Sequence, residues 1–403
     1  MLGQSKNLYH DIKLTLIIVL CGALNGINIA KLAPSIKVLS TDFDLSLSQI
    51  GLLASMFTMI MVVTGVLIGG IVRAVGAKRV LIGALVIACA GNIVAVLGDS
   101  VASLFAGRAI EGISLIAVTL TGPGILARYT DPGHRGWVMG AWGGFMPLGN
   151  GLAVLAASAL ITVGGWKLVW ETGFAFSVLV TFAAAFMIPA DPDQIRIRFD
   201  HSALMAAIKL PLLAIIGLSF ACHSLVYQTL LQFMPLVAQS LGGYTLGQGA
   251  IIVGSFCAIN FIGNLIAGQL LQKGWQPATI VRWVFGSVFI LIVILSQSGL
   301  SSAMLAGFLI IIGFMSGGSA PIFFYLVSRS NSDPQDLPVF VAWVFQIQGL
   351  GMLIGPALVS QVVESSGSWT FGLLCLLPAC LVIVALSGRL KLSSSAQSVV
   401  KAV

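Results

Sequence analysis

The sequence predicts an all-α polytopic membrane protein with twelve transmembrane helices in two six-helix repeats. Three observations support this. The 403 residues are 58% hydrophobic and 8% charged, whereas a soluble domain carries about 25% charge, so the chain cannot cover a water-facing surface. Long apolar runs recur along its whole length, and motifs of the first half return in the second.

Each apolar run has roughly 18–27 residues, enough to cross a bilayer as a helix. The predicted spans are 12–38, 47–71, 80–97, 101–127, 136–163, 169–188, 210–238, 246–271, 278–297, 301–327, 338–362 and 369–387. The longest polar stretch follows the sixth span. We therefore expect an N-terminal six-helix bundle (1–189), a cytoplasmic linker (190–209), a C-terminal six-helix bundle (210–388) and a disordered cytoplasmic tail (389–403).

The basic residues are unevenly placed. Of the 20 lysines and arginines, all but Lys31, Lys37, Arg108 and Lys167 fall on one side of the predicted membrane. This asymmetry follows the positive-inside rule and places both termini in the cytoplasm, as expected for a bacterial inner (cytoplasmic) membrane protein. It also argues that the net charge of +7 does not serve nucleic-acid binding. The first span is too long for a signal peptide.

The sequence lacks the motifs that several kinds of enzyme and metal site require. The six cysteines lie inside apolar runs without metal-ligand spacing. Walker A, nucleophile-elbow and zinc-protease patterns are missing from the sequence. We therefore expect no enzyme, no cofactor and no metal. The expected partners are a small-molecule substrate, protons and membrane lipid, and the protein is expected to act as a monomer.

The two halves carry matching motifs. Gly112 precedes Arg128 by as many residues as Gly313 precedes Arg329, and Asp-Pro follows each arginine within a few residues. Parallel repeats of this kind place a substrate site at mid-membrane, between the halves. The duplication therefore predicts a transporter.

Two ionisable residues lie within the fourth span, where charge is costly and is a functional hypothesis by default. Arg108 and Glu111 are three residues apart, so they share a helix face and partly neutralise one another. We assign Arg108 to substrate binding and Glu111 to proton coupling. The alternative is a structural ion pair that holds the span to a neighbour.

The first span carries a polar stripe. Asn25, Asn28 and Lys31 repeat at intervals of three residues, so they lie on one helix face that should meet protein or water. We expect this stripe to bind substrate, with Lys31 attracting an anion. Alternatively, Lys31 snorkels to the outer headgroups, as expected for Lys37.

The seventh span is the counterpart of the first in the repeat. His223, Tyr227, Gln228 and Gln232 offer hydrogen-bond donors and acceptors, and a histidine titrates near neutral pH. We assign His223 to proton coupling and the other three to substrate binding. A packed, hydrogen-bonded histidine is the competing interpretation.

Spans five and eleven are rich in glycine, and each carries a tryptophan, Trp142 and Trp343. These rings could stack on a substrate, and Gln346 and Gln348 are candidate cavity groups. Helix packing, or contact with lipid for the tryptophans, explains the same residues without a substrate.

A cationic, glycine-containing turn follows the second span. The turn resembles the loop signature of the major facilitator superfamily, G-x-L-A-D-R-x-G-R-K-x-x-L. Its matches are Gly69, Gly76, Lys78 and Leu81, at the first, eighth, tenth and last positions. The turn departs from it at Arg73, where the family has Asp. The predicted gating residues are Gly69, Arg73, Gly76, Lys78, Arg79 and Asp131.

The resemblance implies a rocking-bundle transporter. Arg108 and Gly112 resemble the family's span-four signature, whose arginine faces the central cavity and serves proton transfer or substrate binding. In the family the loop Asp forms a lock with span eleven. With Arg73 in its place, that lock is absent or rebuilt, and Asp131 is a candidate partner.

Segments 138–143 and 341–351 resemble the cyanate and 2-nitroimidazole permease branch. That branch has an anion-binding arginine where this chain has Gly26, so small-anion specificity is not implied. We predict proton-coupled import of a small organic solute, amphipathic or anionic. Proton-coupled efflux of drugs or metabolites is the alternative, favoured by a loose antiporter-like pattern at 140–153. A membrane receptor is a third, weaker interpretation.

Overall fold

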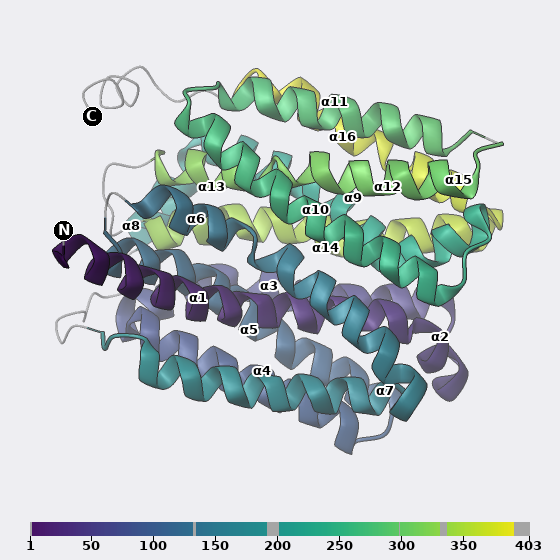
Figure 1. The fold of residues 1–403 in the computed structure, drawn as a ribbon, viewed down its shortest axis with the longest axis horizontal. Helices are drawn as coiled ribbons and strands as arrows, with labels where there is room; N and C mark the ends of the chain where they lie inside the picture. The colour runs from purple at the N-terminus through teal and green to yellow at the C-terminus, as the bar shows by residue number, and fades with distance from the viewer. Residues whose placement is uncertain (1, 132–133, 192–200, 298, 331–336, 391–403) are drawn as a thin grey trace.

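The computed structural model describes residues 2–131, 134–191, 201–297, 299–330 and 337–390, which are almost entirely helical and contain no strand (Figure 1). In chain order, the helices are α1 (Leu2–Ala30), α2 (Leu32–Phe43), α3 (Leu47–Val75), α4 (Ala77–Leu97), α5 (Val101–Tyr129), α6 (Arg135–Gly143), α7 (Phe145–Met187), α8 (His201–Lys209), α9 (Pro211–Gly242), α10 (Leu246–Gln272), α11 (Pro277–Leu295), α12 (Ser302–Gly317), α13 (Ala320–Ser328), α14 (Leu337–Ser366), α15 (Trp369–Leu374) and α16 (Leu377–Ser387).

The predicted membrane crossings are present. Within the described residues, eleven helical stretches are long and apolar enough to span a bilayer. One of them, α7, has 43 residues and is broken at Gly164 and Gly165, where Gly165 has a φ of +68°. Since about 20 residues cross a bilayer, α7 makes two crossings, and the twelve predicted spans are accounted for. The protein is a multi-pass membrane protein.

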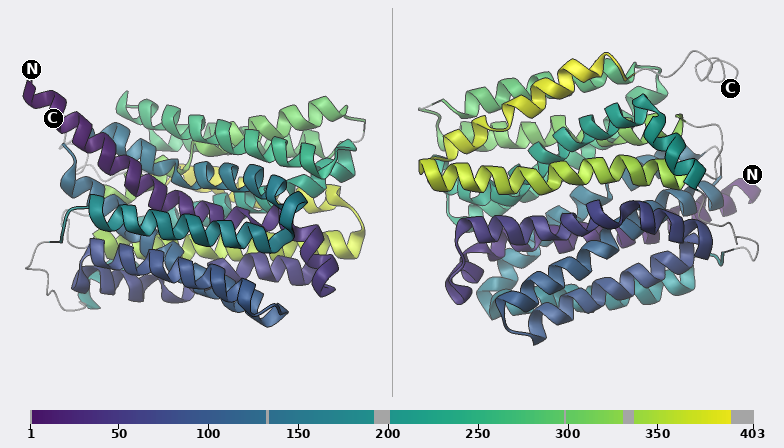
Figure 2. Two further views of the ribbon diagram at one scale, coloured as in Figure 1. Left: turned by 60° about the horizontal axis from the view of Figure 1, so that its bottom comes forward. Right: turned by 180° about the vertical axis from the view of Figure 1, so that it is seen from behind.

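The helices run side by side along the long axis of the molecule (Figure 1). Those of the first half of the sequence pack on one another, as α4 does on α5 and α1 on α7. In the second half, α9 packs on α14 and α10 on α12. Helices α3 and α14 lie against each other across the boundary between the halves (Figure 2, right), and α7 meets α10 there.

The outer surface is apolar. Val163, Phe186 and Trp283 are 81%, 85% and 72% exposed, which would be unfavourable in water. Lipid chains would cover such side chains at no cost, so this surface fits the hydrocarbon core of a bilayer.

The structure differs from the sequence-based expectation at the turn after the second span and in the linker, and the expected tail lies outside the described residues. The turn expected from Gly69 is shorter, because α3 continues through the buried Gly69 to Val75 and only Gly76 separates it from α4. Helix α3 packs against α5 and α14, and tertiary packing overrides the weak helix propensity of glycine. The expected linker contains a helix, α8, while residues 192–200 lie outside the described residues, as does the tail from 391 onward.

Candidate functional site

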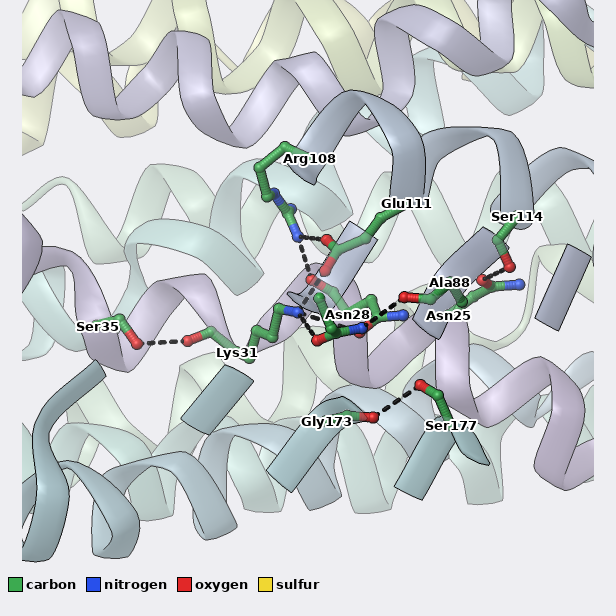
Figure 3. A network of polar contacts seen from close by, with 11 residues as sticks. Asn25, Asn28, Lys31, Ser35, Ala88, Arg108, Glu111, Ser114, Gly173 and Ser177 are labelled. Atoms are coloured by element: carbon green, nitrogen blue, oxygen red, sulfur yellow. Dashed lines mark hydrogen bonds and ion pairs between the residues drawn. The ribbon is translucent and has the colours of Figure 1, made fainter. Parts of the chain in front are cut away.

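A charge cluster, formed by Lys31, Arg108 and Glu111, lies inside the first half of the chain (Figure 3). Lys31 Nζ is 2.5 Å from one oxygen of Glu111, and Arg108 Nη1 is 2.8 Å from the other. None of the three side chains is more than 1% exposed. One carboxylate therefore bridges two cations, and the cluster keeps a formal excess of one positive charge.

Neutral groups complete the cluster. Lys31 Nζ also donates to the side-chain oxygens of Asn92, at 2.6 Å, and Asn28, at 3.2 Å. Arg108 donates to the backbone carbonyl of Asn28. The Lys31 ammonium lies 4.6 Å from the centre of the Trp170 ring, within the range of a cation–π contact. Buried charges need such partners because desolvation penalises an isolated ion.

The structure decides several predictions about this region. The pairing of Arg108 with Glu111 is confirmed, and the Asn25–Asn28–Lys31 stripe faces protein, as expected. The snorkelling alternative for Lys31 is wrong, because Glu111 offers an internal counter-ion. Sequence reasoning missed Asn92, although it is the one amide in an otherwise apolar span.

A separate cavity lies between the two halves of the sequence. Its volume, counted as the space open to the centre of a water molecule, is about 70 Å³. Its lining residues come from α6, α7, α9, α10, α12, α13 and α14: Gly143, Phe145, Met146, Pro147, Phe220, His223, Ser224, Tyr227, Gln228, Asn260, Asn264, Ser316, Ala320, Phe324, Phe345, Gln348 and Met352. Among the described residues, the lining contains no Asp, Glu, Lys or Arg, and the charge cluster is not part of it.

One wall of the cavity is aromatic. The His223 and Tyr227 rings stack with centroids 5.8 Å apart and an interplanar angle of 18°. Phe220 and Phe345 meet nearby at 5.5 Å. His223 Nδ1 also hydrogen-bonds the hydroxyl of Ser319, at 2.9 Å. Flat rings on one wall suit contact with a planar apolar surface.

Amide side chains supply much of the polar lining. Asn260 Nδ2 donates to the Gly313 carbonyl and to Ser316 Oγ, at 2.9 and 3.0 Å. Asn264 Nδ2 donates to the Asn260 carbonyl, at 2.9 Å. From α14, Gln348 Nε2 donates to Ser224 Oγ, at 2.9 Å. The side-chain oxygens of Asn264 and Gln348 have no hydrogen-bond partner.

The predicted substrate-binding residues separate into two groups. Of those residues, Tyr227 and Gln228 line the cavity, and so does His223, which was assigned to proton coupling. Gln348, the second candidate glutamine, lines it too. The others lie outside its lining: Asn25, Asn28, Lys31, Arg108, Trp142, Gln232, Trp343 and Gln346.

Packing explains where two of these residues lie instead. Trp142 is 1% exposed and stacks on Phe145, with ring centroids 4.4 Å apart. Gln346 Nε2 donates to the Val62 carbonyl of α3, at 2.9 Å, so it joins the two halves rather than facing the cavity. Asn260, Asn264 and Ser316 were missed because each lies in a mainly apolar run.

The α3–α4 turn is held by an acidic residue that sequence reasoning missed. Asp191 accepts hydrogen bonds from the backbone N–H groups of Lys78 and Arg79, both at 3.1 Å. Lys78 Nζ donates to the Ile188 carbonyl, at 2.6 Å. Gly76 offers no side chain to cap α4, and Asp191 supplies that cap from the end of α7.

The expected partnership between Arg73 and Asp131 is untested, since the Arg73 side chain is outside the description. The loop that holds Asp131 is tied to α1 by Asp11. Asp11 Oδ2 accepts from the Asp131 backbone N–H, at 3.0 Å, and lies 2.8 Å from His134 Nδ1.

Comparison with known proteins agrees with this architecture. The family model described as Major Facilitator Superfamily matches residues 18–356. The riboflavin transporter RibZ of Clostridioides difficile is 20% identical over 230 residues, which cover 57% of this chain and 50% of RibZ. The uncharacterized MFS-type transporter Rv1877 of Mycobacterium tuberculosis is 22% identical over 310 residues, covering 73% of this chain and 40% of the relative.

The matched stretches thus span half or less of these curated relatives. Neither relative is named as a cyanate or 2-nitroimidazole permease, so that finer resemblance gains no support. The family model, by contrast, covers most of the chain and agrees with the helical, multi-pass architecture. The chain therefore belongs to the Major Facilitator Superfamily of membrane transporters.

Proposed function

We propose that the protein is a secondary active transporter that imports a small organic solute by alternating access, driven by protons. The observation that supports this is the cavity, because residues of both halves line it. Rocking of a bundle of residues 1–189 against a bundle of residues 210–388 would open the cavity to each side of the membrane in turn.

Proton coupling is proposed for Glu111. Within the described residues, its hydrogen-bonded charged partners are Lys31 and Arg108. Protonation of the carboxylate would weaken both ion pairs and change how α5 is held to the α1–α2 junction. His223, which faces the cavity and bonds Ser319, is the second candidate.

The test uses purified protein in proteoliposomes and radiolabelled riboflavin, chosen because one relative is named as a riboflavin transporter. Lumichrome, which is smaller and also uncharged, is the second probe. We expect an inward proton gradient to accumulate at least one probe. Glu111→Gln should keep probe exchange but lose accumulation, at a temperature where the variant stays folded. No movement of either probe under a gradient of either sign would contradict the transport proposal for this class of solute.

Proton-coupled efflux is the second candidate. The aromatic and methionine-containing lining without Asp, Glu, Lys or Arg favours it, because such a surface accepts varied apolar compounds. The same vesicles separate the two candidates. Accumulation of the probe driven by an inward proton gradient supports import, and expulsion of the probe driven by the same gradient supports efflux.

The location, orientation and oligomeric state of the protein are also part of the proposal. The basic residues on one side of the spans support insertion in a bacterial inner membrane with both termini in the cytoplasm. A single chain contributes both walls of the cavity, which supports a monomeric transporter. A C-terminal fluorescent reporter that folds only in the cytoplasm tests the orientation.

A further inference from the structure

We infer that the cavity selects an uncharged, planar solute that donates N–H or O–H hydrogen bonds to Asn264 and Gln348. The inference rests on the proposed transport function and names its substrate class. It replaces the anionic solute that the sequence suggested.

The lining excludes a charged solute. Within the part of the chain that the structure describes, its titratable side chains are His223 and Tyr227, and it holds no Asp, Glu, Lys or Arg. Lys31, Arg108 and Glu111 of the charge cluster are not part of this lining. An ion entering the cavity would lose hydration without gaining a counter-ion, which is a large penalty.

Two buried polar atoms of the lining, one in Asn264 and one in Gln348, have no hydrogen-bond partner within the described residues, and both are acceptors. The carbonyl of Gly313 can only accept, so it fixes the Asn260 amide with its nitrogen towards α12. The Asn260 carbonyl in turn fixes the Asn264 nitrogen, at 2.9 Å. The atom of Asn264 left without a partner is therefore an oxygen. In Gln348, the nitrogen is used by Ser224 and lies 3.9 Å from Met352 Sδ, which leaves its oxygen free.

These acceptors are buried. Asn264 is 2% exposed and Gln348 is 8% exposed. A buried polar atom without a partner costs free energy that a complementary ligand recovers. The aromatic wall of His223, Tyr227 and Phe220 supplies the stacking surface for a flat ring.

The test measures binding, so its failure is distinguishable from a failure of transport. The probes are uracil and lumichrome, each compared with its 1,3-dimethyl derivative, which lacks the N–H donors. The corresponding charged probes are orotate and the alloxazine carboxylate in which one ring methyl of lumichrome is replaced by a carboxylate. Purified protein in nanodiscs is titrated with each, by calorimetry for the pyrimidines and by fluorescence for the alloxazines.

We expect at least one parent compound to bind about tenfold or more tightly than both its methylated and its charged counterpart. Asn264→Leu and Gln348→Leu should each reduce the ratio of parent affinity to methylated-compound affinity towards one. Gln269→Leu, an exposed amide on the same helix as Asn264, should leave the ratio unchanged. The ratio is insensitive to a partly unfolded fraction, because both ligands see the same protein.

Three outcomes would overturn the inference: equal binding of the methylated compounds, preferred binding of the charged ones, or no binding by either parent compound. Each of them leaves import or efflux to be decided by the vesicle experiment.

Discussion

At the scale of single residues, the shared carboxylate of Glu111 determines how much each substitution in the buried charge cluster lowers the stability of the protein. Glu111→Gln leaves Lys31 and Arg108 buried without a counter-ion, which should cost about 3–5 kcal/mol. Lys31→Met keeps the Arg108–Glu111 pair and removes the excess positive charge, so its cost should be smaller. Thermal unfolding in detergent, followed by tryptophan fluorescence, should give the lower Tm for Glu111→Gln. An equal Tm for the two variants would contradict the bridging role.

Sequence reasoning found the charged residues but not their arrangement. The intrahelical pair of Arg108 and Glu111 follows from a spacing of three residues. The contact between Lys31 and Glu111 joins residues 80 positions apart, and helical periodicity carries no information about such contacts. Gln346 and Gln348 show the same limit, because both point towards protein and only packing assigns one to α3 and the other to the cavity.

At the scale of elements, the α3–α4 turn depends on one glycine and one distant carboxylate. Gly76 has a φ of +104°, and a Cβ there would collide with Asp191. Gly76→Ala should therefore cost about 1–3 kcal/mol through backbone strain. Asp191→Ala should cost about 0.5–2 kcal/mol by removing the cap of α4.

Gly268→Ala is the control for Gly76→Ala, because Gly268 is a helical glycine without a positive φ. It is inside α10, and nothing would contact its Cβ within 4 Å. Thermal unfolding should show no loss for Gly268→Ala. Similar losses at both positions would show that the turn is not specially constrained.

Sequence reasoning located this turn from its glycines and basic residues, yet it missed both its length and its cap. Gly69 suggested a break, but tertiary packing overrides the weak helix propensity of a buried glycine. Asp191 follows the sixth span and approaches α4 only in the folded protein. By contrast, four helix starts within the described residues use a local capping side chain, that of Ser46, Ser100, Thr245 or Ser301.

At the scale of the whole molecule, the fold was predictable because the bilayer dictates it. Apolar runs of membrane-spanning length must be helical, since lipid offers no partner for backbone groups. Their number was predictable for the same reason, and Gly164–Gly165 marks where one long helix becomes two spans. The position of the cavity depends on which faces meet between the halves, and sequence alone does not contain that information.

The central claim is that the two halves move against each other around the cavity. Helices α3 and α14 line their boundary, with Ser55 Oγ donating to the Leu353 carbonyl at 2.9 Å and Ser48 donating to Glu364. Spin labels at positions 48 and 364 therefore report on the boundary. Labels at positions 48 and 100, both in the first half, serve as the control pair.

Double electron–electron resonance spectroscopy measures both distances most directly. The labelled protein lacks its native cysteines and is held in nanodiscs. We expect two populations for the 48–364 pair, with proportions that shift with pH and with lumichrome, and a single unchanged population for the 48–100 pair. A single 48–364 distance that responds to neither would contradict alternating access in this protein.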